Sequence, residues 1–188
     1  MKVQLSAIFE QFEFITPGAK FDELWDQINN HLAVSELNDV YIEITVNILT
    51  IASFQTIINL IFGLRQIYSQ RRPRVFFELS NLSPEFLNAQ LLPASSYDIV
   101  EHAWAFMMKK STSDSIFTSD ELDQVQTLLD WLNQGCNKSK EYAKLQYVEF
   151  YHHIMKLQNS SDKKFEDVFP ELQNFYKTAE HQYLQTLE

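Results

Sequence analysis

Residues 40–79, VYIEITVNILTIASFQTIINLIFGLRQIYSQRRPRVFFEL, decide the fold. Val40–Val46 and Val75–Leu79 are dense in β-branched and aromatic residues, which favour strands. Between them, apolar residues of Ala52–Ser69 recur at helical spacing, and Pro73 ends that segment because the residue before a proline is pushed out of the α region. A strand, a helix of about five turns and a second strand form a βαβ unit. We therefore expect two parallel strands joined by a right-handed crossover.

The predicted sheet is small. An amphipathic helix is expected over Phe21–Leu32, and a third strand has its best candidate within Val3–Phe14. Parallel strands are normally buried on both faces in sheets of several members, and two strands alone are marginal in water. Either the following helices cover this sheet, or the sheet belongs to a larger architecture that another chain completes.

The second half of the chain is predicted to be helical. Ser95 or Ser96 can cap a helix that runs through Lys110, and the capping-box pattern of Thr118–Glu121 opens another that ends at Gly135. A further helix is expected over 139–158, followed by two short helices that Pro170 separates. The predicted fold class is α/β: a partial, barrel-like βαβ segment over 1–93, with a small parallel sheet, and a helical segment over 94–188.

Charge excludes one large class of partners. The 188 residues include 15 Lys+Arg against 25 Asp+Glu, a formal net charge of −10. A domain this acidic repels a phosphate backbone, so we expect no general nucleic-acid binding. The one basic run is Arg65, Arg71, Arg72 and Arg74. It could hold an anion, but it is more typical of a solvated helix end, where cations favour the helix dipole.

No membrane segment is predicted. The most apolar stretch, Ile42–Leu64, is interrupted by polar residues and does not resemble a spanning helix. The first residues, MKVQLSAIFEQFEF, carry two glutamates and lack a small-residue cleavage site, so they do not resemble a signal peptide. The expected location is the cytoplasm.

Motifs that carry chemistry are scarce. The sequence holds no nucleophile elbow, phosphate-binding glycine loop or zincin helix. Glu149 and His152 have the E-x-x-H spacing of di-iron bundles, but a single copy is more typical of surface residues. The only cysteine, Cys136, follows a predicted helix end where the dipole disfavours a thiolate. We therefore predict no catalytic and no metal-binding residue.

Position on the βαβ unit supplies the candidate binding residues. Ligands of parallel α/β sheets gather beyond the carboxyl ends of the strands. Asn47 and Asn81 place amide groups at that rim and are the predicted cofactor-binding residues. The alternative is that both asparagines cap the turn or helix that follows.

Four stretches together resemble the later part of radical S-adenosylmethionine (SAM) proteins, in particular a group often found in phages and described as twitch-domain radical SAM proteins. These stretches are FDELW (21–25), ITVNI (44–48), LSPEFLNAQLLP (82–93) and VFPEL (168–172). The resemblance extends from about Phe14 to Tyr176. It implies the late strands of a partial radical-SAM-like barrel with the tail that covers them, and a phage-encoded protein.

The family holds a [4Fe–4S] cluster in a C-x-x-x-C-x-x-C loop, and this cluster cleaves SAM. The chain has no such loop, and one thiolate cannot hold the cluster. The resemblance therefore implies a truncated or split protein without autonomous radical chemistry, which pairs with a complementary N-terminal half or associates with itself. SAM and the cluster enter only if a partner supplies the cysteines. Since late strand ends of such barrels touch SAM or substrate, the resemblance adds weight to Asn47 and Asn81.

Two other hypotheses stay open. The chain could be a self-contained helical interaction or regulatory protein without catalytic activity, whose helices cover the small sheet completely. Less favoured is an enzyme that uses carboxylates and histidines of the helical half, such as His152.

Overall fold

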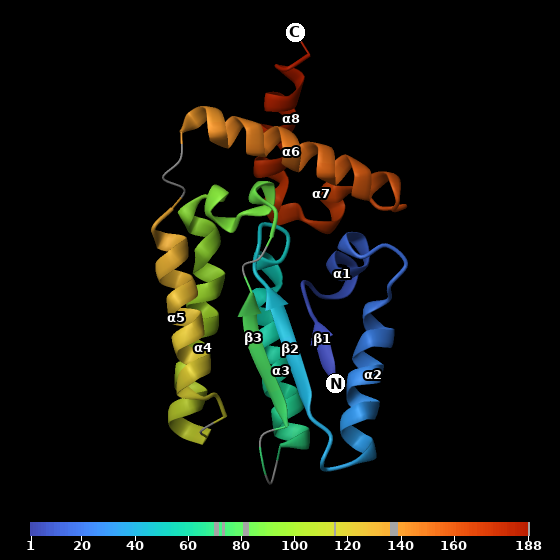
Figure 1. Cartoon of the computed structure of the whole chain (residues 1–188), viewed down its shortest axis with the longest axis vertical. Coiled ribbons are helices and arrows are strands. Elements are labelled where there is room, and N and C mark those ends of the chain that lie inside the picture. Colours follow the sequence, from blue (N-terminus) through green and yellow to red (C-terminus); the bar gives the residue numbers. More distant parts are fainter. Residues whose placement is uncertain (70–71, 73, 81–82, 115, 136–138, 188) are drawn as a thin grey trace.

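The computed structural model describes residues 1–69, 72, 74–80, 83–114, 116–135 and 139–187. Three strands form a parallel sheet in the order β1-β2-β3: β1 (Lys2–Gln4), β2 (Val40–Thr45) and β3 (Val75–Ser80) (Figure 1). The predicted parallel pairing of the two long strands is confirmed, with Val40 opposite Val75. The third strand begins one residue before its candidate segment and overlaps it only at Val3 and Gln4, because the chain turns into a helix at Phe9.

Helices connect consecutive strands. The connection from β1 to β2 contains α1 (Phe9–Ile15) and α2 (Phe21–Val34), and α3 (Phe54–Tyr68) connects β2 to β3. In Figure 1, α3 lies behind β2 and β3. Each strand alternates a buried residue with a more exposed one, so one face of the sheet packs against helices. The buried apolar strand residues are Val3, Val40, Ile42, Ile44, Val75 and Phe77, and Thr45 at the end of β2 is buried as well.

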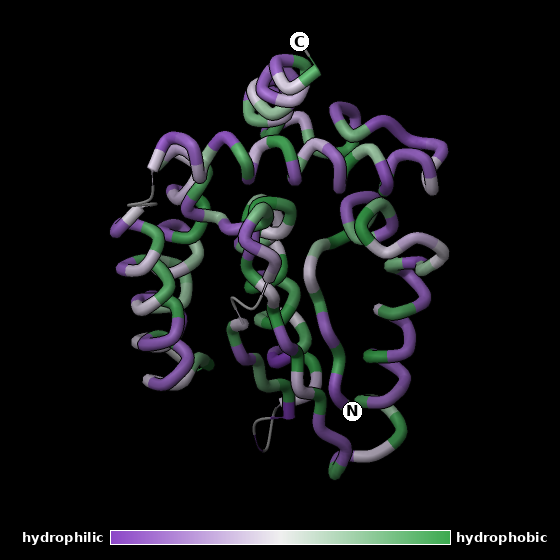
Figure 2. Tube along the Cα trace, turned by 45° about the horizontal axis from the view of Figure 1, so that its top comes forward, coloured by the Kyte–Doolittle hydropathy of each residue, from purple (hydrophilic) through white to green (hydrophobic). Residues whose placement is uncertain are grey.

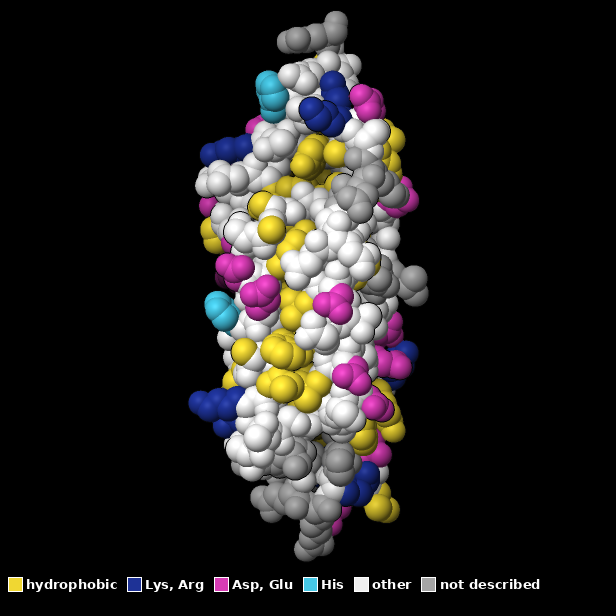
Figure 3. All heavy atoms as spheres, turned by 90° about the vertical axis from the view of Figure 1, so that its left-hand side faces the viewer, with side chains coloured by type: hydrophobic (Ala, Val, Ile, Leu, Met, Phe, Trp, Pro, Cys, Tyr) yellow, Lys and Arg dark blue, Asp and Glu magenta, His cyan; other side chains and the backbone are white. Residues whose placement is uncertain are grey.

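A helical hairpin follows β3. It consists of α4 (Asp98–Asp114), which packs against α3, and α5 (Ser119–Asn133), which runs beside β3. The predicted capping box is present at the start of α5: Thr118 accepts a hydrogen bond from the Glu121 amide, and the Glu121 carboxylate accepts one from the Thr118 amide. Figure 3 views the molecule from the α4–α5 side, where apolar side chains form an interrupted strip between acidic ones.

The last helices cross over the carboxyl ends of the strands (Figure 1). They are α6 (Lys140–Asn159), α7 (Phe165–Val168) and α8 (Gln173–Leu184), and an aromatic cluster joins them to α1. Short 3₁₀ turns at 51–53, 85–87, 89–91, 94–97 and 170–172 complete the connections. The chain traced in Figure 2 alternates hydrophobic and hydrophilic stretches along its helices, and one core cluster runs through both halves of the sequence.

The arginine run is not a solvated helix end. Arg65 and Arg74 are 7% and 5% exposed. Arg74 donates hydrogen bonds to the carbonyls of Leu32 and Ser35 at the end of α2, so it satisfies acceptors that the helix leaves open. Arg72 pairs with Asp39 at 2.7 Å, and Arg71 lies outside the described residues. The expectation of solvation is wrong for the two buried arginines because tertiary carbonyls and carboxylates replace water.

None of the helices in the described part of the chain combines the length and apolar character that crossing a bilayer requires.

Candidate functional site

The face of the sheet opposite the helices is largely uncovered. Lys2, Gln4, Tyr41 and Glu78 on this face are exposed, and Glu43 is half-buried. Such a face is unusual, since helices normally cover parallel sheets on both sides. We therefore treat this face as the candidate binding surface of the fold.

Side chains on the uncovered face are ordered by contacts with one another. Tyr41 and Phe76 stack with ring centroids 5.1 Å apart, although Tyr41 is 51% exposed. Lys2 pairs with Glu43 at 3.0 Å. The Gln4 amide donates to the Thr45 hydroxyl at 3.0 Å. A partly exposed aromatic pair beside oriented charges resembles the anchor and rim of a protein interface.

Helix α5 forms a wall beside this face. A hollow of about 590 Å³ lies between the sheet and the start of α5. We call it the sheet groove, and its charged residues are mostly acidic. It is lined by Lys2, Tyr41, Ile42, Glu43, Phe76, Phe77, Glu78, Thr118, Ser119, Asp120, Glu121 and Gln124.

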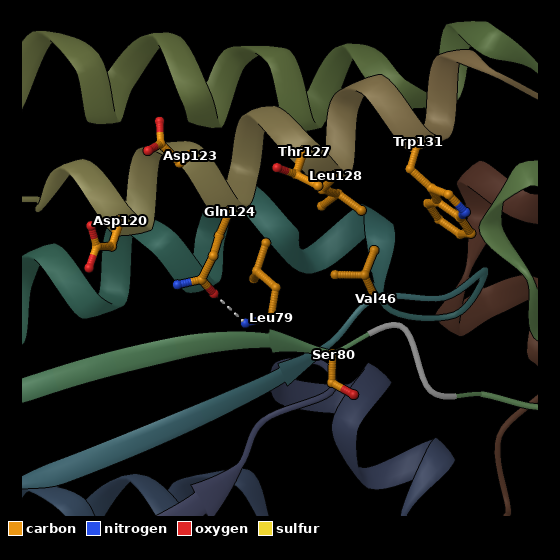
Figure 4. Close-up of a pocket in the computed structure, with 9 residues that line it drawn as sticks. All are labelled: Val46, Leu79, Ser80, Asp120, Asp123, Gln124, Thr127, Leu128 and Trp131. Carbon is orange, nitrogen blue, oxygen red and sulfur yellow. Dashed lines mark hydrogen bonds between the residues drawn. The ribbon is translucent and has the colours of Figure 1, made fainter.

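A second hollow, of about 560 Å³, lies between α5 and the carboxyl end of β3 (Figure 4). Its apolar part includes Val46, Leu128 and Trp131, and it shares Asp120 and Gln124 with the sheet groove. The two hollows therefore meet along α5 and run from the middle of β3 to its end.

The outer edge of β3 is occupied by side chains. The Leu79 amide donates to the Gln124 side-chain oxygen at 3.0 Å, and Figure 4 shows Gln124 reaching from α5 toward β3. Arg65 donates from Nε to the Val75 carbonyl at 2.9 Å and binds the Glu121 carboxylate with both terminal nitrogens. Side chains of α3 and α5 thus bind two of the main-chain groups with which β3 would pair with another strand.

Asn47 is placed at the carboxyl end of β2, as predicted, but it is 7% exposed and its side chain serves a turn. Its amide oxygen accepts a hydrogen bond from the Leu49 amide at 2.9 Å, and its carbonyl accepts from the Thr50 and Ile51 amides. This geometry is the turn-capping alternative. Asn81 lies outside the described residues, so the structure brings only one of the two candidates into view.

We expect Asn47→Ala to lower the free energy of unfolding by about 1–2 kcal/mol, because it leaves the buried Leu49 amide without its acceptor. Chemical denaturation measures the loss. Asn47→Asp keeps an acceptor oxygen at the same position and should lose less. Equal losses in both variants would contradict the turn-capping role.

The histidines do not assemble a metal site. Glu149 and His152 both lie exposed on α6, and the described residues contain no group of three potential ligands. His153 is different, since it packs on Phe86 with ring centroids 5.2 Å apart. Burial, with a smaller effect of Lys156, lowers the pKa of His153 below its ordinary value of 6.5.

Stability should therefore decrease at mildly acidic pH. The folded chain resists protonation of His153 while the unfolded chain accepts it, so the free energy of unfolding falls as the pH drops below about 6.5 and toward the lowered pKa. In His153→Gln this component of the pH dependence disappears. Unfolding free energies near pH 7.5 and pH 5.5, about one unit either side of the ordinary pKa, measure it. His152→Gln is the matched control, and identical profiles for wild type and His153→Gln would refute the expectation.

Comparison with known proteins identifies no relative: no protein-family model matches the chain, and neither a curated protein nor a solved structure matches it. The strands and helices of the chain show that it is an α/β protein.

Sequence reasoning did not single out the residues of the sheet groove. A signal was present, since Tyr41, Glu43 and Glu78 alternate with apolar residues in their strands. Alternation is the mark of a half-buried strand. The general expectation that parallel strands are buried on both faces led away from this signal of an exposed sheet face.

Proposed function

We propose that the chain is the later part of a radical-SAM-like barrel, without autonomous radical chemistry, that pairs with a cluster-bearing half on another chain. The observation that carries this proposal is the uncovered face of a parallel sheet whose strands follow one another in sequence order. The phage origin that the family resemblance implies belongs to the same proposal, and so does the cytoplasmic location expected from the sequence.

The strand order supports a barrel ancestry. Crossovers of one hand that always step to the next strand place their helices on one side, as in βα barrels, where helices form the outer ring. Doubly wound sheets reverse the strand order and gain helices on both faces. Three strands are too few to close a barrel. The face that would line the barrel interior is then the one that carries Tyr41, Glu43, Phe76 and Glu78.

The donor set of the chain does not fit a [4Fe–4S] cluster. Clusters of this type need several thiolates, and the sequence has Cys136 alone, outside the described residues. Reductive cleavage of SAM would therefore depend on cysteines of the partner. What this chain contributes is a sheet surface and the helical tail that covers the strand ends.

The proposal is tested in two steps. Purified chain incubated with iron, sulfide, a reductant and SAM should develop no cluster absorption and no 5′-deoxyadenosine, and either signal would refute the proposal. The DNA immediately upstream of Met1 should then encode a chain with a three-cysteine loop, and co-expression should give a stoichiometric complex. Cysteine-to-alanine variants of that chain should still bind, because pairing uses the sheet and not the cluster.

A self-contained interaction protein is the alternative. The occupied edge of β3 and the core shared by both halves of the sequence favour it. The uncovered sheet face does not, because this alternative requires complete coverage by the chain's own helices. Light scattering after size exclusion distinguishes the split protein from the self-contained one. A monomer that melts cooperatively and does not bind the upstream chain supports the self-contained alternative.

A further inference from the structure

We propose that a partner chain adds a strand to the outer edge of β1, and that the partner surface facing the sheet groove is basic. The inference deepens the proposed function and rests on it only in requiring that a partner exists. It specifies which edge receives the partner and what charge the partner carries.

The two edges of the sheet are not equivalent. On β3, Gln124 and Arg65 bind two main-chain groups that point outward, so side chains of the same chain occupy part of that edge. On β1, the Met1 carbonyl and the Leu5 amide bond to β2, at Tyr41 and Glu43. In a parallel ladder, the main-chain hydrogen-bonding groups of every second residue point to the same neighbouring strand.

Consequently, the main-chain groups of Lys2 and Gln4 point away from β2, and both residues are exposed. Their side chains are held over the sheet face, where Lys2 pairs with Glu43 and Gln4 donates to Thr45. An extended segment of another chain can add as a strand to an exposed sheet edge of this kind.

The charge of the sheet groove selects the partner. Glu43, Glu78 and Asp120 line it, with Lys2 already paired to Glu43. A second copy would bring the same carboxylates against these and add another net charge of −10. Like charges brought together across an interface oppose association, whereas a basic segment is attracted. The occupant is therefore a basic chain and not a second copy.

A synthetic strand tests both parts without requiring the natural partner. The probe is a fluorescent peptide in which Lys and Val alternate, and its length of about ten residues is that of a long natural strand. Fluorescence anisotropy should show binding to the wild-type chain. A peptide that alternates Glu and Val should not bind. N-methylation of alternate amides keeps the charge but removes strand pairing, and should weaken binding about tenfold.

Variants of the protein localise the contact. Gln4→Pro removes an outward amide while the bonds of β1 to β2 remain, and should weaken the Lys–Val peptide about tenfold. Glu43→Lys, which reverses the groove carboxylate on β2 opposite Gln4, should do the same through charge. The matched control is Asp26→Lys/Glu101→Lys, which reverses two exposed charges on α2 and α4 and should have little effect.

Each other outcome overturns a stated part. Peptide binding that survives both N-methylation and Gln4→Pro would refute strand addition at the β1 edge. If Gln4→Pro fails to fold, the N-methylated peptide alone provides this test. Absence of peptide binding would refute the claim that the partner is a basic chain. A dimer of the chain that Gln4→Pro abolishes would refute it as well. A peptide that binds as expected while no upstream cysteine-loop chain exists would refute the proposed function and leave this inference standing.

Discussion

Replacing Glu121 by alanine is expected to lower the free energy of unfolding by about 3–5 kcal/mol, because Arg65 would remain buried without its counter-charge. The two side chains are each 6% exposed. The guanidinium also donates to the carbonyls of Val75 and Ile116, and its carbon lies 5.1 Å from the centre of the Phe117 ring. These contacts hold Arg65 in place, so it cannot reach water when the carboxylate is removed.

Chemical denaturation with a linear extrapolation measures this loss. Asp123→Ala removes an exposed carboxylate from the same helix and should stay within about 0.5 kcal/mol of the wild type. The double variant Arg65→Met/Glu121→Leu should recover much of the stability, because well-packed apolar residues often replace a buried ion pair at little cost. A Glu121→Ala variant as stable as Asp123→Ala would show that the pair contributes nothing.

Phe165→Ala should destabilise the chain by about 3–5 kcal/mol through loss of burial and the cavity that remains. Phe165 is fully buried and its ring contacts those of Phe150, Phe169 and Tyr176 with centroids 6.0, 5.0 and 4.9 Å away. It also contacts Phe14 on α1. The cavity would therefore open where the last helices meet the start of the chain.

Thermal unfolding followed by circular dichroism gives the measurement. Leu145→Ala on α6 is the control, since Leu145 is 55% exposed and its truncation should cost no more than about 0.5 kcal/mol. If both variants melt at the wild-type temperature, the C-terminal helices are not part of the cooperative core.

Much of the fold could be predicted from local pattern. The βαβ unit follows from two β-branched segments separated by a helical period, and the capping box at Thr118 was sufficient to place the start of α5. These features depend on residues close together in sequence. The short strand β1 was harder to bound, because its three residues depend on pairing with β2 for their conformation.

The candidate site could not be predicted in the same way. The roles of Arg65 and Gln124 arise only when α5 reaches β3 across dozens of intervening residues. A basic run read in isolation suggests solvation, since nothing nearby in sequence reveals the buried carboxylate of Glu121. Asn47 illustrates the opposite case, a role that depends on residues close in sequence. Its side chain caps a turn formed with Leu49 and Thr50.

The helix that closes β3 has a consequence for stoichiometry. A sheet with two receptive edges can add subunits at both ends and grow into a filament, whereas a sheet with one closed edge adds a neighbour on a single side. Because Gln124 and Arg65 bind outward groups of β3, the strand addition proposed above would take place at β1 alone. If the proposed addition occurs, we expect finite complexes of defined composition and no open-ended polymers.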